Sequence, residues 1–308
     1  MVARVAQEWF AICGGCEVTI LDIGEPLLDL LEKINIVHMP VIMDHKLFGQ
    51  TGEGTAMEIP EAEVGIITGG VRNEEHRHLA REMRKKCKVL IAMGSCACSG
   101  GVPALGNLYL KEEILDKVYK DSVSTDKDGV VPKDDIPPLT DRVYAISEVV
   151  PVDVSLPGCP STPEMVAEAL TALLTGKAFS LPTKSVCDDC PVIREKKAVS
   201  TLKRNLQAAE FTVGRPLKEM RCLMEQGILC LGPATRTGCG GSEGTPRCIR
   251  AYQPCEGCFG PISEKANPMV DMMGALSTVG LDPKNISDRA ATFNRFAGAG
   301  RLRPMPKR

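Results

Sequence analysis

Fourteen cysteines among 308 residues constrain this chain more than any other feature of its sequence. The opening residues, MVARVAQEWFAI, contain neither a basic segment followed by a long apolar run nor a twin-arginine pair. We therefore expect no export signal and a cytoplasmic location. Thiols in a reducing cytoplasm do not persist as disulfides. Most of the cysteines are accordingly expected to bind metal rather than to form a disulfide scaffold.

The rest of the composition is that of a globular protein of about two domains. Hydrophobic residues make up 44% of the chain, which is enough for a sizeable core. A net charge of −2 and only 4% aromatic residues argue against a surface for nucleic acid or anionic lipid. Apolar runs such as VLIAM at 89–93 are far shorter than the ~18–20 residues that cross a bilayer. We expect no nucleic-acid or membrane partner.

Residues 1–182 alternate between strand-like and helix-like patterns. Short apolar runs predict strands at 5–12, 36–43, 64–68, 89–93 and 152–156, and helical spacing predicts helices at 17–33, 73–86 and 163–174. Strands that alternate with helices form a parallel sheet, so we predict a doubly wound α/β domain. The polar segment 117–142 is expected to be a surface insertion, either a solvated loop or a contact for a partner.

Residues 183–308 follow a different pattern and predict a second domain. Helical spacing is convincing only around 199–210 and 271–279, and residues 213–261 are mostly Gly, Pro and Cys. Such a stretch has too little apolar periodicity to form a core of its own. We therefore predict a mostly irregular domain that is held together internally by metal bound to its eight cysteines.

Four cysteines of the first domain follow predicted strands. Cys13 and Cys16 form C-G-G-C after the first strand, Cys96 lies in G-S-C after the fourth, and Cys159 lies in P-G-C-P after the fifth. The loops at the carboxyl ends of parallel strands meet at one edge of the sheet. These thiolates can therefore surround one metal ion or cluster. Glycines at 14, 15, 94 and 158 allow the backbone to approach it and to donate N–H groups to sulfur.

The second domain supplies eight more cysteines, which suffice for two four-cysteine sites: Cys187, Cys190, Cys222, Cys230, Cys239, Cys248, Cys255 and Cys258. Two cysteines remain. Cys87 ends a predicted helix and is expected to be a small buried residue, whereas Cys98 could replace its neighbour Cys96 as a ligand. Four-cysteine spacing alone fits zinc as well as iron–sulfur clusters. Single cysteines drawn from distant positions, and three sites in one chain, favour iron–sulfur clusters and electron transfer.

Five motifs, in this order along the chain, resemble those of the small subunit of nickel–iron hydrogenases. They are CGGCE at 13–17, GSCACSGG at 94–101, LPGCP at 156–160, C-x-x-C-P at 187–191 and PCEGC at 254–258. The resemblance runs from about residue 5 to 262. Within the family it is greatest to the cytoplasmic, methyl-viologen-reducing (deazaflavin-non-reducing) type, whose small (gamma) subunit partners heterodisulfide reductase in methanogens.

The resemblance implies a flavodoxin-like first domain (1–182) with a proximal cluster, and a second domain (183–308) with a medial and a distal cluster. It assigns the proximal cluster to Cys13, Cys16, Cys96 and Cys159, the medial cluster to Cys239, Cys248, Cys255 and Cys258, and the distal cluster to Cys187, Cys190, Cys222 and Cys230. Many relatives have His where Cys187 stands and Pro where Cys248 stands. With Cys at both positions we expect three [4Fe-4S] clusters.

The same resemblance implies that the chain relays electrons and carries no nickel–iron site. The expected partners are the hydrogenase large subunit, a [2Fe-2S] delta-type subunit and heterodisulfide reductase. We expect no catalytic residue in this chain, because it lacks a Ser/His/Asp set and a phosphate loop. The four histidines, at 38, 45, 76 and 78, are expected to be structural or exposed.

Two alternatives remain open. One is the small subunit of a deazaflavin-reducing hydrogenase, although such chains tend to continue into C-x2-C-x2-C-x3-C runs that this sequence lacks. The other is a non-catalytic, zinc-stapled interaction protein. The basic residues of the C-terminal segment 289–308 predict either a solvated tail or a docking site for a partner; they are Arg289, Arg295, Arg301, Arg303, Lys307 and Arg308.

Overall fold

The computed structural model describes residues 2–43, 58–126, 128–196, 198–203 and 209–304. By its contacts the chain forms two compact units. The first comprises Met1–Phe179 together with Phe296–Arg308, and the second comprises Ser180–Arg295. The C-terminal residues 296–304, which we expected in the second domain, thus belong with the first unit.

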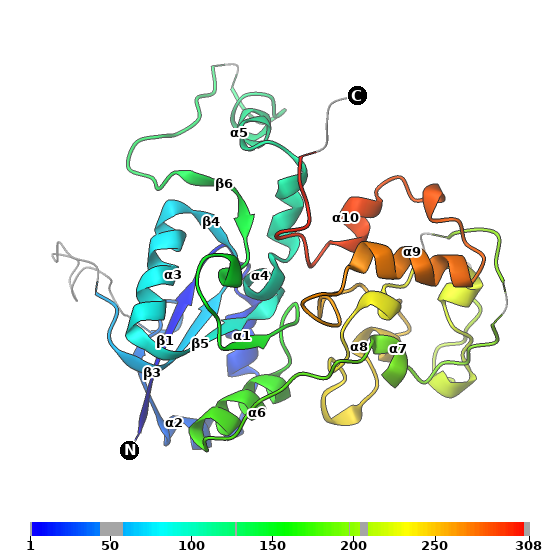
Figure 1. Ribbon diagram of the computed structural model, residues 1–308, viewed down its shortest axis with the longest axis horizontal. Helices are drawn as coiled ribbons and strands as arrows, with labels where there is room; N and C mark the ends of the chain where they lie inside the picture. Colours follow the sequence, from blue (N-terminus) through cyan, green and yellow to red (C-terminus); the bar gives the residue numbers. More distant parts are fainter. Residues whose placement is uncertain (1, 44–57, 127, 197, 204–208, 305–308) are drawn as a thin grey trace. The chain divides into compact units, whose positions relative to one another are not determined.

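A five-stranded parallel sheet forms the centre of the first unit (Figure 1). Its order is β2-β1-β3-β5-β7, and the strands are β1 (Ala3–Trp9), β2 (Ile34–His38), β3 (Ala62–Thr68), β5 (Cys87–Met93) and β7 (Val154–Leu156). Most residues of β3 and β5 are buried apolar side chains, as expected for central strands that are covered on both faces. The predicted α/β fold is confirmed, with the strand order of flavodoxin-like domains.

Helices flank this sheet, and two of them, at 74–86 and 163–174, form where the sequence predicts. They are α1 (Gly15–Leu21), α2 (Pro26–Leu31), α3 (Glu74–Lys86), α4 (Gly94–Ser99), α5 (Lys111–Tyr119) and α6 (Pro163–Leu174). The side chain of Asn73 caps α3 by accepting a hydrogen bond from the backbone N–H of His76 at 2.7 Å. Acidic residues in the first turn of α3 and basic residues in its last turn complement the helix dipole.

Three local predictions for the first unit were wrong. The predicted helix 17–33 is divided into α1 and α2, because Gly24 adopts a φ of +74° and Pro26 begins a new helix. The predicted strand 36–43 ends at His38 as β2, two residues before Pro40. The end of the predicted insertion 117–142 is not a loop, because β6 (Leu139–Tyr144) pairs there with β4 (Val71–Asn73) in an antiparallel sheet.

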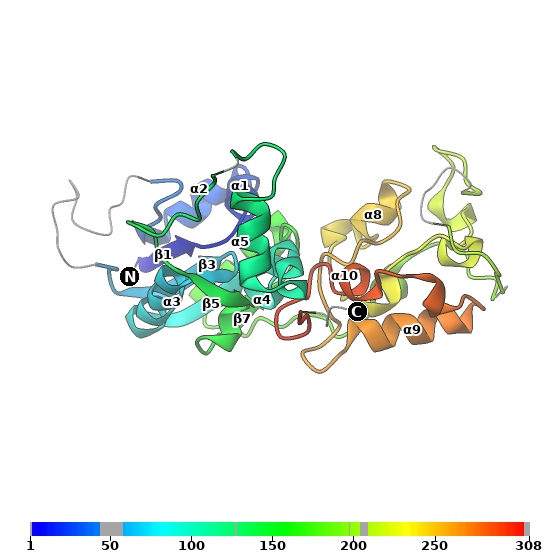
Figure 2. The same ribbon diagram turned by 90° about the horizontal axis from the view of Figure 1, so that it is seen from above.

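Short helices and turns make up the second unit (Figure 2). Its elements are α7 (Val186–Asp189), η4 (Leu217–Glu219), η5 (Met224–Gln226), η6 (Gly232–Ala234), η7 (Gly241–Glu243), α8 (Arg247–Arg250), α9 (Pro268–Thr278), η8 (Pro283–Asn285) and α10 (Arg289–Phe293). Over its described residues this unit contains no strand longer than an isolated bridge. The predicted irregular character is therefore confirmed, and α9 matches the predicted helix 271–279.

The predicted helix 199–210 is absent from its described part, residues 199–203 and 209–210; residues 204–208 lie outside the described residues. Its backbone groups bond to other segments instead of to each other. The N–H of Val199 donates to the carbonyl of Val279 at 2.8 Å, and the N–H of Lys203 donates to the carbonyl of Gly227 at 2.6 Å. Tertiary pairing thus overrides the local helical pattern.

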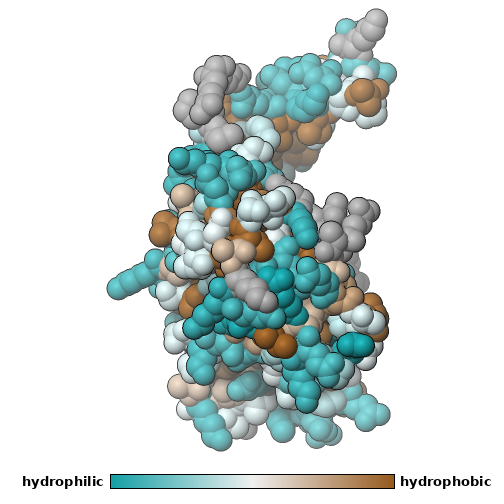
Figure 3. Space-filling view, turned by 90° about the vertical axis from the view of Figure 1, so that its right-hand side faces the viewer, coloured by the Kyte–Doolittle hydropathy of each residue, from teal (hydrophilic) through white to brown (hydrophobic). Residues whose placement is uncertain are grey.

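Among the described residues, no helix is both long and apolar enough to cross a membrane. Hydrophilic residues cover most of the face drawn in Figure 3, and apolar residues occur there in small groups.

Candidate metal centres

Four cysteines of the first unit lie where the parallel strands end. Cys13 stands between β1 and α1, Cys16 is in α1, Cys96 is in α4 directly after β5, and Cys159 follows β7. Burial, followed by the charges of Cys159 and Cys13, raises the pKa of Cys96 to about 12. Partial burial of its thiol, although the residue as a whole is exposed, and then the neighbouring Cys13 also raise the pKa of Cys159. The four thiols are thus close enough to repel one another as thiolates, which is the situation that a bound cation relieves.

Glycines bring the backbone close to these thiols. Gly94 has a φ of +86°, and a Cβ at this position would collide with the sulfur of Cys16. A Cβ on Gly101 would lie 2.6 Å from the sulfur of Cys96. Two hydrogen bonds join the segments on either side, because the N–H of Ser95 donates to the carbonyl of Gly158 at 2.7 Å and the N–H of Gly158 donates to Ser95 Oγ at 3.2 Å. This backbone geometry excludes larger residues from the edge of the site.

Four cysteines of the second unit line a single cavity. They are Cys187, Cys190, Cys222 and Cys230, and the rest of the lining is apolar except for Arg194. Burial, followed by the charge of Cys230, raises the pKa of Cys187 to about 12. Burial also raises the pKa of Cys230 to about 12, against hydrogen bonds from the N–H groups of Gly232 and Cys255 that stabilise its thiolate. Backbone N–H groups that donate to sulfur in this way also stabilise the thiolate ligands of iron–sulfur clusters.

The other four cysteines of the second unit interact electrostatically in pairs. Burial raises the pKa of Cys239, and the charge of Cys248 adds to this effect. Burial likewise raises the pKa of Cys255, followed by the charges of Cys230 and Cys258. The N–H of Cys255 donates to the sulfur of Cys230 at 3.2 Å. Cys255 therefore lies between its own predicted set and the set that contains Cys230.

Chemically, all three predicted sets suit iron–sulfur clusters, since thiolate sulfur is their usual ligand. Within residues 2–43, 58–126, 128–196, 198–203 and 209–304, no three or more Cys, His, Asp or Glu side chains are already arranged around one metal ion.

The two remaining cysteines occupy different environments. Cys87 is buried in the core of the first unit against Gly65, and burial raises its pKa to about 11. This position agrees with the predicted structural role. Cys98 donates a hydrogen bond from its thiol to the carbonyl of Ala92 at 3.2 Å, and its charge also contributes to raising the pKa of Cys16.

A buried carboxylate that lies next to Cys16 was not identified from the sequence. Glu17 is 3% exposed, and its Oε1 accepts hydrogen bonds from Thr68 Oγ1 at 2.5 Å and from Gln7 Nε2 at 3.0 Å. It is also the largest charged contributor to the raised pKa of Cys16, after burial. The signal that could have found it is the acidic residue directly after C-G-G-C.

The histidines within the described residues agree with the predicted structural or exposed roles. His38 is buried and its Nε2 pairs with Glu8 Oε1 at 2.5 Å. Burial lowers the pKa of His76 to about 4, and its ring stacks on Phe10 with 4.8 Å between the ring centroids. His78 is exposed on α3. His45 lies outside the described residues.

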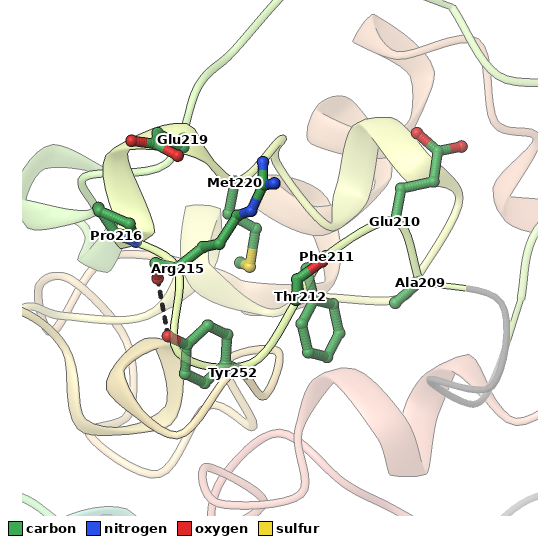
Figure 4. A pocket seen from close by; sticks show the side chains of 9 residues that line it. All are labelled: Ala209, Glu210, Phe211, Thr212, Arg215, Pro216, Glu219, Met220 and Tyr252. Carbon is green, nitrogen blue, oxygen red and sulfur yellow. Dashed lines mark hydrogen bonds between the residues drawn. The ribbon is translucent and has the colours of Figure 1, made fainter.

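A surface pocket of about 380 Å³ lies on the second unit (Figure 4). The rings of Phe211 and Tyr252 stack in its wall with 5.5 Å between their centroids, and the Tyr252 hydroxyl donates to the carbonyl of Arg215 at 2.8 Å. Met220 also lines this pocket and belongs to the apolar cluster on which Cys190 and Cys222 pack.

A parallel sheet with cysteines at its strand ends, together with an irregular, cysteine-rich unit, fits the class of iron–sulfur electron-transfer subunits. Residues 13–173 match the family described as the NADH ubiquinone oxidoreductase 20 Kd subunit. Over 297 residues the chain is 43% identical to one subunit of the F420-non-reducing hydrogenase vhu of Methanocaldococcus jannaschii, a match that covers 96% of this chain and 95% of the relative. The chain belongs to this family, as a small subunit of the nickel–iron hydrogenases.

Solved structures agree with this family. A chain of an NAD+-reducing [NiFe]-hydrogenase in the H2-reduced state is 33% identical, with a TM-score of 0.54 over 59% of this chain and 96% of that chain. A chain of the [NiFeSe] hydrogenase of Desulfovibrio vulgaris Hildenborough is 16% identical, with a TM-score of 0.54 over 86% of this chain and 95% of that chain, and supports the fold alone. The protein is thus a hydrogenase small subunit that carries iron–sulfur clusters and pairs with a large subunit.

Proposed function

We propose that this subunit relays electrons from dihydrogen oxidation on the large subunit through three [4Fe-4S] clusters to an acceptor such as the heterodisulfide reductase complex. The observation that carries the proposal is the cavity of the second unit, which four predicted ligands line together. A four-iron cluster binds four cysteine thiolates and, when bound, accepts or donates one electron at a time. The apolar residues around this cavity would exclude water from the metal.

The proximal cluster is assigned to Cys13, Cys16, Cys96 and Cys159. Cys13 and Cys159 are exposed at the carboxyl edge of the sheet, whereas Cys16 is buried. Exposure at this edge suits a cluster that receives electrons from another subunit. We therefore propose that the large subunit covers this edge.

The distal cluster is assigned to the cavity cysteines, and the medial cluster to Cys239, Cys248, Cys255 and Cys258. The hydrogen bond from Cys255 N–H to the sulfur of Cys230 supports adjacent positions for the two sets. Because Cys187 and Cys248 are thiolates rather than His and Pro, we propose four-iron clusters of low potential at both positions. Neutral imidazole ligands raise cluster potentials, and this chain would lack them.

The acceptor is proposed from the named relatives. The M. jannaschii relative is an F420-non-reducing hydrogenase subunit, which favours an acceptor other than the deazaflavin F420. We propose a [2Fe-2S] delta-type subunit followed by heterodisulfide reductase, within methanogenic metabolism in the cytoplasm. Two departures from this function remain testable: a deazaflavin acceptor, and zinc in place of iron.

Substitution of Cys248 tests the cluster type most sharply. In the anaerobically purified complex, Cys248→Pro should create a three-iron electron paramagnetic resonance signal and raise the midpoint potential of one cluster. Cys87→Ala, which removes a buried thiol outside the three sets, is the matched control and should leave every signal unchanged. If Cys248→Pro changes no signal, Cys248 is not a ligand, and the proposed four-cysteine medial cluster is wrong.

A further inference from the structure

Residues 296–302, here termed the C-terminal strap, bury four of their residues in the first unit, whereas the sequence predicted either a solvated tail or a docking site for a partner. Ala297 is 3% exposed, Ala299 is 5% exposed and Leu302 is 2% exposed. The strap begins after Arg295, beyond the end of α10, and precedes Arg303, which is exposed. The strap is therefore a short packed segment with a defined beginning and end.

The strap packs on the end of the segment that carries Cys96. Ser99 Oγ donates to the carbonyl of Phe296 at 2.7 Å, and the N–H of Ala299 donates to the carbonyl of Ser99 at 3.0 Å. Gly101 and Ala297 form a parallel bridge. One side-chain hydrogen bond and two backbone contacts thus hold the strap along residues 99–101.

Small residues on both sides allow this close approach. A Cβ on Gly100 would lie 2.6 Å from the Cβ of Ala299, and a Cβ on Gly298 would lie 2.9 Å from the Cβ of Ala104. Both distances are shorter than two carbon atoms tolerate. Glycine at positions 100 and 298 therefore allows the two segments to lie this close together. Gly298 and Ala299 of the strap are therefore explained by packing against residues 100 and 104, which follow Cys96.

The same segment contacts Cys96 from its other side. A Cβ on Gly101 would lie 2.6 Å from the sulfur of Cys96 and 2.9 Å from its Cα, and the N–H of Gly100 donates to the Cys96 carbonyl at 3.0 Å. Ser99 Oγ also lies 3.2 Å from the carbonyl of Ser95, the residue that is joined to Gly158. Residues 99–101 thus lie between the strap and the thiol.

We propose that the C-terminal strap positions the Cys96 thiolate for the proximal cluster by holding residues 99–101 in place. The proposal rests on the assignment of Cys96 as a ligand of that cluster. Ligand positions that are held by a supporting layer of contacts keep both metal affinity and potential within narrow limits. Ser99, Gly100 and Ala299 are then positioning residues that do not touch the metal.

Two truncations of the subunit, purified in complex with the large subunit, test the strap. Deletion of residues 296–308 removes it, whereas deletion of residues 303–308 leaves it intact and serves as the matched control. We expect the shorter chain to lose about a third of its iron together with the proximal electron paramagnetic resonance signal, because one of three four-iron clusters would be lost. The control should keep all of its iron and all of its signals.

A single substitution covers the case in which the shorter chain fails to fold. Ala299→Val adds bulk where Gly100 leaves no room, and it should shift the proximal midpoint potential while the total iron is kept; Ala178→Val, at an exposed position of the same unit, should shift nothing. Cys96→Ala identifies the proximal signal by removing it. If Cys96→Ala removes the signal but neither the 296–308 deletion nor Ala299→Val changes it, the strap proposal is wrong. If Cys96→Ala also leaves every signal unchanged, Cys96 is not a ligand of the proximal cluster, and the strap proposal is wrong as well.

Discussion

The two compact units derive their order from different sources. In the first unit a parallel sheet buries large side chains almost completely, among them Ile67, Leu90 and Ile91. In the described part of the second unit, one apolar cluster has five buried residues, and Cys190 and Cys222 pack against it. The core of the first unit is built on a continuous sheet, whereas the second unit has short helices and turns with cysteines packed against its apolar residues. We infer that metal contributes most of the folding free energy of the second unit only.

Removal of the clusters should produce the largest difference between the units. Structural metal binding contributes on the order of 10 kcal/mol in small metal-dependent domains. Chelated or oxidised protein should therefore be cut first within residues 213–261 during limited proteolysis, while the sheet of the first unit stays intact. Equal resistance of the metal-free and metal-loaded second unit would contradict this comparison.

Truncation of buried isoleucines should give the second largest difference in stability between the units. Ile91→Ala in β5 should lower the free energy of unfolding of the first unit by about 2–5 kcal/mol, with or without metal. Ile228→Ala in the second unit should have a similar cost only while the clusters are bound. Both residues are almost fully buried, so they form a matched pair. Hydrogen exchange during urea denaturation measures each unit separately, and an effect of Ile228→Ala in metal-free protein would show that the second unit folds without metal.

Loss of a helix cap should give the smallest effect. Asn73 caps α3 in the first unit, and Asn267 caps α9 in the second by accepting from the N–H of Met269 at 3.0 Å. Replacing either asparagine by alanine should cost about 1 kcal/mol in the metal-loaded protein. After chelation only Asn73→Ala should still lower stability, as measured by thermal unfolding of the first unit. Persistence of the Asn267→Ala effect in chelated protein would argue that α9 remains folded.

Sequence patterns predicted most of the first unit, because its strands are short apolar runs that fit no other secondary structure well. Residues 64–68 and 89–93 form β3 and β5 as expected, and the cysteines that follow the strands meet at one edge. The pairing of β4 with β6 was not predicted, because it joins residues near 71 to residues near 140. Local patterns do not encode such distant pairings.

Where local and tertiary preferences disagree, the sequence patterns failed. Residues 199–203 have helical spacing, but their backbone pairs with distant segments. The strap at 296–302 has a basic flank that suggested solvent, whereas its small residues pack against the Cys96 segment. In both cases the deciding partner is far away in the sequence and could not be identified without the fold.

Iron and acid-labile sulfide analysis of the anaerobically purified complex tests the central claim most directly. Three four-iron clusters require about twelve irons and about twelve sulfides for each copy of this chain, in addition to the iron of the large subunit. We expect this content, with little zinc. Stoichiometric zinc with little sulfide would contradict the relay and would leave the cysteine sets as structural staples.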